Sequence, residues 1–251
     1  MNHDDTSISI SPAVQDYLRA IYQLTGEVAP DSQAPDSRAT TSQLAERLDV
    51  RPASVTAMLQ RMASAAPALV EYHKSHGARL TADGERAALS VVRCHRLLEL
   101  FLHEKLGYGW DEVHDEADRL EHVLSEEMTS RIDRTLGYPT HDPHGHAIPA
   151  ADLSLSRPEG VPLGDLGEGE PGVVEFVRDE NADMLRYLDT VGLRPGAIVA
   201  IVRREPDQEL LWLDLGGDTI PLSELVAGQV FVTRPAPRIP QNTSKSSIRE
   251  S

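Results

Sequence analysis

Apolar residues in the first part of the chain recur at helical spacing and predict a helix that precedes a helix-turn-helix. Ser11-Pro12 is typical of a helix start, with Ser as N-cap and Pro at the first helical position. The apolar positions that follow are spaced three or four residues apart: Val14, Tyr17, Leu18, Ile21 and Leu24. Residues 26–39 are rich in Pro, Asp and Ser and predict a loop.

The pattern from residue 40 to residue 80 predicts a winged helix-turn-helix. A short helix from Thr41 to Leu48, a turn at residues 49–51 and a helix from Pro52 follow one another, and the second helix has Val55, Leu59 and Met62 on one face. Apolar and polar residues alternate in parts of residues 69–80, and His76-Gly77 predicts a turn there, which is typical of a β-hairpin wing. A small helical hairpin that binds nothing has the same helical pattern, and the wing favours DNA binding over that alternative.

The rest of the chain changes from helical to strand periodicity. Long helices are expected over residues 81–106 and about 111–136, separated by Gly107-Tyr108-Gly109. Residues 151–170, rich in Pro, Gly and Glu, predict an exposed linker. GVVEFVR, AIVAIVRRE, ELLWLDLGG and GQVFVTR predict strands of a small β-barrel, with a short helix near residues 183–191, and a disordered tail is expected at 235–251.

These elements predict an α+β fold with several domains. Residues 1–80 form a winged helix DNA-binding domain in this scheme, and residues 81–150 form a helical domain. A linker at 151–170 connects them to a small β domain at 171–234, with the tail after it.

Several features of the sequence predict a cytoplasmic protein. The chain has 251 residues and one cysteine, Cys94, so that no disulfide can form within it. No apolar run is long enough to cross a membrane, and the N-terminal residues do not resemble a signal peptide.

The charge is distributed unevenly. The net charge is −16, which alone argues against nucleic-acid binding. Residues 40–86 hold six Lys/Arg and five Asp/Glu, a balance of +1, so the remainder carries −17. If the protein binds DNA, it does so through this segment, and a cation that neutralised carboxylates elsewhere would help.

The chemically informative residues are histidines and carboxylates at helical spacing. Asp118, Glu121 and His122 stand at i, i+3 and i+4 and share one helix face, with His114 one turn earlier. The preceding helix has His95 and Glu99 at i, i+4, and the first helix places Asp16 among apolar neighbours. Converging nitrogen and oxygen donors on facing helices are the usual way to bind a divalent metal in a bundle. Any one of these residues alone is better explained as part of a solvated, charge-paired helix face, but the set is not.

Two other interpretations of the polar residues are less favoured. Hydrolytic enzymes also use His and carboxylate ligands, but the chain has no HExxH, no GxSxG and no glycine-rich phosphate loop, so we expect no enzyme activity. His141, His144 and His146 cluster in THDPHGHAIP and could bind metal, although a structural role is favoured for a loop.

The order of these motifs resembles the diphtheria toxin repressor family of iron- and manganese-dependent regulators. The motifs together span residues 11–233. In chain order they are the helix-turn-helix, the wing, HRLLE, VHDEA with a following EH, DPHG with a following IP, and a β domain. The resemblance implies a homodimer that binds palindromic operators when metal-loaded, dimerises through the helical domain, and has an SH3-like third domain.

The resemblance also implies the metal ligands. The primary site would be Asp16, Asp118, Glu121 and His122. The ancillary site would be His95, Glu99 and His114, with Glu180 and Asp183 as candidates from the third domain. Iron-type members have Met and Cys where this chain has Asp16 and Asp118, and hard carboxylate oxygens suit Mn²⁺.

We therefore expect a Mn²⁺-dependent homodimeric repressor of the manganese branch, controlling manganese uptake genes. An iron-dependent repressor, using Fe²⁺, is the alternative within the family, and a metal-buffering protein is the alternative outside it. The helix at residues 51–62 is expected to enter the major groove. Base-facing candidates are Arg51, Ser54, Thr56 and Ala57, and phosphate-facing candidates are Arg47, Arg61, Lys74 and Arg79.

Overall fold

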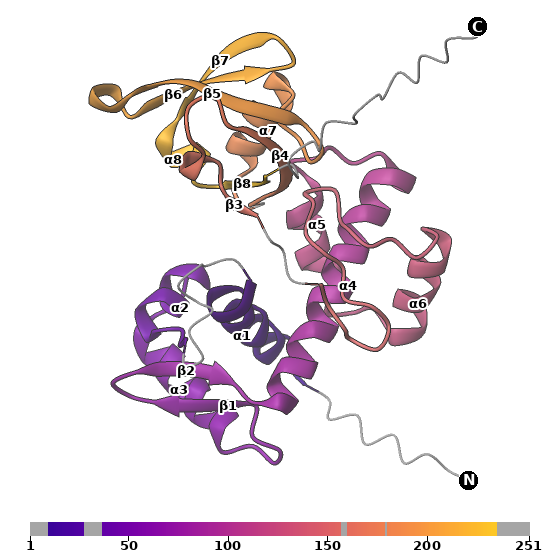
Figure 1. Cartoon of the computed structure of the whole chain (residues 1–251). Helices are drawn as coiled ribbons and strands as arrows, with labels where there is room; N and C mark the ends of the chain where they lie inside the picture. Colours follow the sequence, from indigo (N-terminus) through magenta and orange to yellow (C-terminus); the bar gives the residue numbers. More distant parts are fainter. Residues whose placement is uncertain (1–9, 28–36, 157–159, 179, 235–251) are drawn as a thin grey trace, which may run out of the picture.

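The computed structural model describes residues 10–27, 37–156, 160–178 and 180–234, and they form three parts (Figure 1). A helical part with a two-stranded hairpin lies at the bottom of the view, a second helical part lies to its right, and a β-rich part lies above both. The expected disordered tail at 235–251 and most of the expected loop at 26–39 lie outside the described residues. The α+β fold class is confirmed.

The first part is a winged helix. It contains α1 (Pro12–Tyr22), a π-helical turn (Gln23–Glu27), α2 (Thr41–Arg47), α3 (Pro52–Ala63), β1 (Val70–His73) and β2 (Gly77–Leu80). The Thr40 side chain accepts a hydrogen bond from the Gln43 amide and caps α2. Leu18 and Ile21 of α1 are fully buried in one hydrophobic core with Leu44 of α2 and Leu59 of α3. Because of this shared core, a displacement of α1 is transmitted to α3.

A single long helix joins the first part to the second. The helix α4 (Ala82–Leu106) contributes Ala88 and Val92 to the winged helix core, and its second half contributes Leu97, Leu98 and Leu102 to another core. Residues of α4 are therefore buried in both parts at once. Figure 1 shows α4 running from the wing towards α5 and α6.

The expected helix over residues 111–136 is wrong, because the structure has two helices there. The helix α5 (Val113–Leu120) ends in a turn at residues 121–123, and α6 (Glu126–Thr135) begins after Ser125. The Ser125 hydroxyl accepts a hydrogen bond from the Met128 amide, so it caps a new helix instead of continuing the old one. As a consequence Glu121 and His122 lie at the end of α5 and in the following turn.

The third part is a six-stranded antiparallel sheet with one longer helix. Its strand order is β3-β8-β4-β5-β6-β7. The elements are β3 (Val161–Pro162), β4 (Pro171–Val177), α7 (Ala182–Val191), β5 (Ile198–Glu205), β6 (Leu210–Leu215), β7 (Asp218–Ser223), α8 (Glu224–Ala227) and β8 (Val230–Thr233), with 3-10 turns at Leu163–Asp165 and Pro206–Gln208.

Two features of the third part differ from the sequence prediction. Strand β7 was missed. Residues 161–166, expected in a linker, belong to the sheet domain: β3 pairs with β8, and Leu163 and Leu166 are buried in the domain core.

The third part rests on the loop at residues 141–149. The Val177 amide of β4 donates a hydrogen bond to the His144 carbonyl at 3.0 Å. Trp110, which precedes α5 and is buried in the core of the third part, donates its indole N–H to the Pro143 carbonyl at 2.9 Å. Gly145 has φ +91°, and a Cβ there would lie 2.1 Å from the Glu175 carbonyl oxygen. Only glycine permits so close an approach between this loop and β4.

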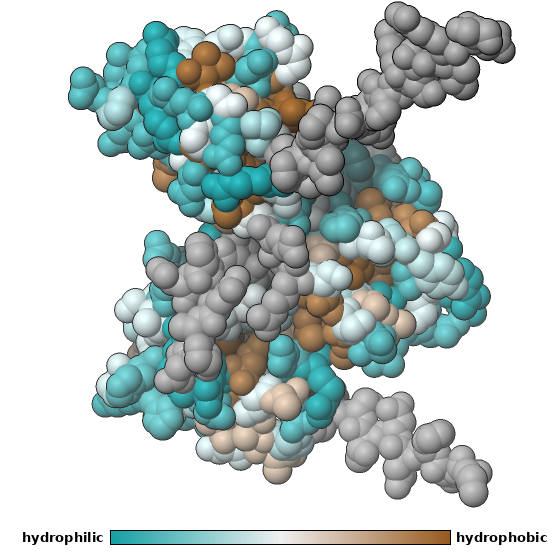
Figure 2. All heavy atoms as spheres, viewed as in Figure 1, coloured by the Kyte–Doolittle hydropathy of each residue, from teal (hydrophilic) through white to brown (hydrophobic). Residues whose placement is uncertain are grey.

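The described residues include no helix that is long and apolar enough to cross a membrane. Figure 2 shows a mostly hydrophilic face, with apolar residues gathered in the middle of the view, where α4 passes between the two helical parts.

Candidate metal centre

The first group of candidate ligands joins α1 to the end of α5. Asp16, Glu121 and His122 each offer a ligand atom, and these atoms lie within 4.8 Å of one another. The His122 Nε2 atom lies 2.9 Å from Asp16 Oδ1 and 3.6 Å from Glu121 Oε1. His122 Nδ1 lies 2.7 Å from the Gln15 side-chain oxygen, so it donates there and leaves Nε2 of the neutral ring as the ligand atom.

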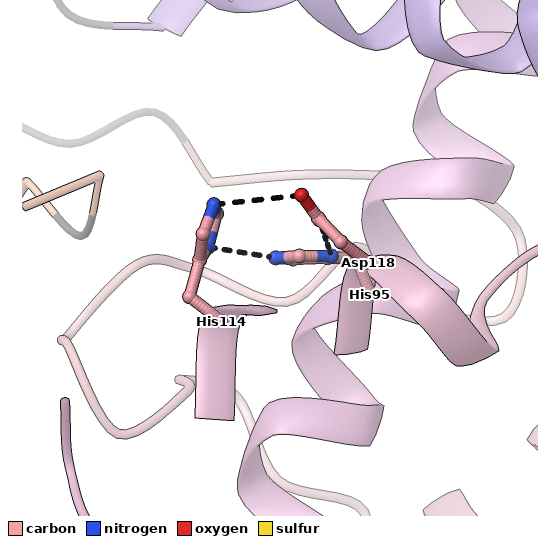
Figure 3. Close-up of side chains that lie close together, drawn as sticks. All are labelled: His95, His114 and Asp118. Carbon is pink, nitrogen blue, oxygen red and sulfur yellow. Dashed lines mark hydrogen bonds and ion pairs between the residues drawn. The ribbon is translucent and has the colours of Figure 1, made fainter. Parts of the chain in front are cut away.

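The second group joins α4 to α5. His95, His114 and Asp118 lie together, and Figure 3 shows the two imidazoles and the carboxylate turned towards one another. His95 Nδ1 lies 3.2 Å from Asp118 Oδ1, and His95 Nε2 lies 3.2 Å from His114 Nδ1. The resemblance assigns Asp118 to the primary site, but in this structure it groups with the ancillary residues. The two groups nevertheless adjoin, since His95 Nδ1 is only 2.7 Å from Glu121 Oε2.

A third group includes Asp142 and His144, which were not among the predicted metal ligands. Glu99, Asp142 and His144 are all buried and offer ligand atoms within 4.8 Å of one another. His144 Nε2 lies 2.9 Å from the Trp110 carbonyl and must donate to it, so Nδ1 of the neutral ring faces Glu99 with its lone pair. The signal in the sequence was the aspartate two positions before a histidine in DPH, next to the histidines already noted. His141 is exposed and lies outside this group.

The titration behaviour of this cluster follows from its crowding. Burial opposes the charging of His95, but the Glu99 carboxylate and hydrogen bonds to Glu121 and Glu99 outweigh it and raise the pKa of His95 to about 9. Burial likewise opposes ionisation of Glu99, yet its histidine neighbours hold its pKa well below the usual value. Burial raises the pKa of Asp16, with His122 and Arg19 acting in the opposite direction. Cations stabilise these carboxylates in every case.

The donor set fits a divalent cation. Glu99 Oε2 and Glu121 Oε1 are buried and accept no hydrogen bond within the described part of the chain, whereas Asp142 Oδ2 lies 3.7 Å from Arg96 Nε. A buried carboxylate oxygen without a hydrogen bond is costly unless a cation is bound to it. The donors are carboxylate and imidazole throughout. The Cys94 thiol points instead to the Glu121 main-chain oxygen, 3.7 Å away.

Arg19 was not selected from the sequence, yet it lies among these ligands. Its Nη1 atom is 2.7 Å from Asp118 Oδ1, 3.2 Å from Glu121 Oε2 and 2.7 Å from His95 Nδ1. It follows Asp16 by three positions and shares its face of α1. Burial opposes ionisation of Asp118, but Arg19 outweighs it and, with His95 and His114, holds the pKa of Asp118 below its usual value.

The structure does not bring the two expected third-domain ligands to this centre. The Glu180 carboxylate binds Arg47 of α2, with 2.8 Å between Oε1 and Nη2, and the exposed Asp183 pairs with Arg186 on its own helix. The third domain instead supports the centre indirectly, through the hydrogen bond from Val177 to the His144 carbonyl. The position of Glu180 and Asp183 in the sequence, near the start of α7, could not show whether they bind a metal or pair with an arginine.

The expected DNA-contacting residues fall mostly on one exposed surface. Arg51, Ser54, Ala57 and Arg61 are exposed on or just before α3, and Thr56 is half-buried. Lys74 is exposed in the turn between β1 and β2. Two candidates have carboxylate partners in this conformation: Arg79 binds Glu71, and Arg47 binds Glu180.

Family models match all three parts of the chain. An iron dependent repressor N-terminal DNA binding domain matches residues 9–78, an iron dependent repressor metal binding and dimerisation domain matches 81–150, and a FeoA domain matches 161–234. The three matches together cover most of the chain.

Individual relatives match most of this chain. The iron-dependent repressor IdeR of Mycobacterium leprae is 31% identical over 87% of this chain and 95% of its own. IdeR of Mycobacterium tuberculosis is 34% identical over 74% of this chain and 81% of its own.

Two similar solved structures are named with a bound metal, manganese in one and zinc in the other. A "Manganese-dependent transcriptional repressor complex with manganese" has a TM-score of 0.79 and 34% identity, covering 88% of this chain and 99% of its own. ScaR with bound Zn²⁺ has a TM-score of 0.73 and 31% identity, with the same coverage. The chain therefore belongs to the diphtheria toxin repressor family of metal-dependent transcriptional repressors, with a winged helix DNA-binding domain, a dimerisation domain and an SH3-like third domain.

Proposed function

We propose that this protein is a Mn²⁺-dependent repressor that binds palindromic operators as a homodimer in the cytoplasm and controls manganese uptake genes. The observation that carries the proposal is the convergence of α1 with α4 and α5 through ligand-type side chains. Asp16 comes from the DNA-binding domain, while Glu121 and His122 come from the dimerisation domain. A bound divalent ion would supply one positive centre that accepts lone pairs from both domains.

The coupling to DNA runs through the core of the winged helix. Asp16 lies between Val14 and Leu18, which are buried in the core that also holds Leu59 of α3. Fixing Asp16 relative to α5 therefore fixes the orientation of α3. Neutralising these carboxylates also lowers the repulsion between an acidic protein and DNA phosphates.

The donor chemistry favours Mn²⁺. Carboxylates and imidazoles form all three ligand groups, and no thiolate or thioether belongs to them among the described residues. Hard oxygen donors suit Mn²⁺, whereas sulfur donors suit later metals. The similar solved structure that is named as a manganese-dependent repressor agrees with this choice. The similar proteins that are named iron-dependent repressors make Fe²⁺ the alternative.

Homodimerisation is proposed to use the helical domain. Val123 and Met128, beside and on α6, expose 77% and 47% of their surface. A second copy packed there would remove this apolar surface from water. The two copies would then present their α3 helices to two half-sites of a palindrome.

The three ligand groups predict two distinct ion sites in each chain. The first is built on Asp16, Glu121 and His122 together with the adjoining His95 Nδ1 and Asp118, and the second is built on Glu99, Asp142 and His144. Replacing His144 by Ala removes a ligand from the second site only. We expect equilibrium dialysis with metal analysis to find two Mn²⁺ per wild-type chain and one in His144→Ala.

The matched control is His141→Ala, since His141 is an exposed histidine in the same loop. This variant is expected to keep both ions. Loss of both ions in His144→Ala, or loss of neither, contradicts the division into two sites.

The metal choice is tested by operator binding. Full-length protein and DNA from upstream of its own gene are titrated anaerobically with Mn²⁺ or Fe²⁺, and binding is followed by fluorescence anisotropy. We expect Mn²⁺ to produce tight operator binding, because the oxygen-rich donor set accepts its geometry.

Two other outcomes have definite meanings. Activation by Fe²⁺ at a far lower free concentration than Mn²⁺ would replace the manganese assignment with the iron one. Metal binding without any operator binding would favour a buffering protein.

The DNA surface is tested by its salt dependence. Arg61 is exposed in the last turn of α3, where it can contact phosphate. Arg61→Ala is expected to weaken operator binding and to reduce the slope of log K against log salt by about 0.9, the value for one lost phosphate contact. Arg203→Ala, which removes the same charge from an exposed position on β5 of the third domain, is the control and should leave the slope unchanged. Equal slopes for wild type and Arg61→Ala would remove Arg61 from the interface.

A further inference from the structure

The Arg19 guanidinium occupies a position in which it competes with a metal ion. Its Nη1 atom lies 2.7 Å from His95 Nδ1, 2.7 Å from Asp118 Oδ1 and 3.2 Å from Glu121 Oε2. These three atoms come from two of the three candidate ligand groups. One nitrogen of Arg19 therefore takes up donor atoms that the metal centre uses.

Two of the three distances among these donor atoms are close to those between neighbouring ligands of a small ion. His95 Nδ1 lies 2.7 Å from Glu121 Oε2 and 3.2 Å from Asp118 Oδ1. Neighbouring ligands in an octahedral shell with bonds of ~2.1 Å are ~3.0 Å apart. His95 Nδ1 therefore has nearly the spacing from each carboxylate that a small ion would require, and the Arg19 guanidinium lies among these atoms instead.

His95 cannot serve Arg19 and an ion at once. An imidazole nitrogen has a single lone pair. If that of Nδ1 accepts a hydrogen bond from Arg19, it is not available to a metal. If Nδ1 carries a proton instead, Glu121 Oε2 accepts that proton at 2.7 Å, and the lone pair is again absent. Either arrangement must break before His95 Nδ1 binds an ion.

The charge of Arg19 adds a second reason for competition. A guanidinium stays protonated in proteins, so Arg19 cannot reduce the repulsion by losing its charge. Its side chain is only 13% exposed, so water screens it weakly. An incoming divalent cation must displace the guanidinium or remain close to it, and both weaken its binding.

We propose that Arg19 is an internal cation that competes with the metal for His95, Asp118 and Glu121 and thereby sets the ion concentration at which the protein responds. This inference rests on the proposed metal-dependent function. Asp16 and Arg19 stand three residues apart on one face of α1. The same helix face therefore offers the metal a ligand at Asp16 and a competitor at Arg19.

The test is Mn²⁺ affinity, measured on the full-length metal-free protein at constant pH by electron paramagnetic resonance of the free ion. We expect Arg19→Ala and Arg19→Gln to bind Mn²⁺ at least about tenfold more tightly than wild type, because charge-assisted hydrogen bonds no longer have to break. The control is Arg119→Ala, which removes a positive charge from an exposed position on α5, and it should leave the affinity nearly unchanged.

Thermal unfolding separates competition from a structural role. Competition predicts that Arg19→Gln lowers the Tm of the metal-free protein, which loses a counter-charge, and enlarges the rise in Tm that Mn²⁺ produces. Unchanged or weaker Mn²⁺ binding in both Arg19 variants, beside a wild type that binds Mn²⁺, would overturn the proposal alone. A wild type that binds no Mn²⁺ would overturn the proposed function and this inference with it.

Discussion

Repulsion between crowded carboxylates is the constraint on which the rest of this structure depends. Glu99 and Glu121 are buried, Asp16 and Asp118 are half-buried, and all lie where α1 meets α4 and α5. Carboxylates so close together and so poorly solvated require cations between them. In this structure the positive charge comes from the chain itself, through Arg19 and a His95 whose pKa is raised to about 9.

The location of this cluster explains how a small ion could control a distant surface. The helix α1 is packed into the winged helix core, and α4 contributes to that core and to the core of the dimerisation domain. A cation bound between them would therefore influence the angle at which α3 is presented. The third domain adds to this arrangement by holding the loop of His144 against Glu99.

Helical periodicity predicted much of this centre, and long-range contacts account for what it missed. Spacing alone placed His95 with Glu99, and placed Asp118, Glu121 and His122 on one helix face, because i, i+3 and i, i+4 relations are local. The break after Leu120 was missed because its signal is the single N-cap Ser125. Arg19 and Asp142 were missed, and Glu180 misplaced, since their partners lie far away in the sequence.

Thermodynamic linkage gives the most direct test of the central claim, which is that one centre ties the DNA-binding domain to the dimerisation domain. The measurement is the Mn²⁺ dissociation constant of the full-length protein with and without saturating operator duplex. If the centre orients α3, DNA must tighten Mn²⁺ binding by the same factor by which Mn²⁺ tightens DNA binding. The account predicts a factor of at least about tenfold, within the usual range of coupling free energies. An identical Mn²⁺ affinity in the presence and absence of operator would contradict it.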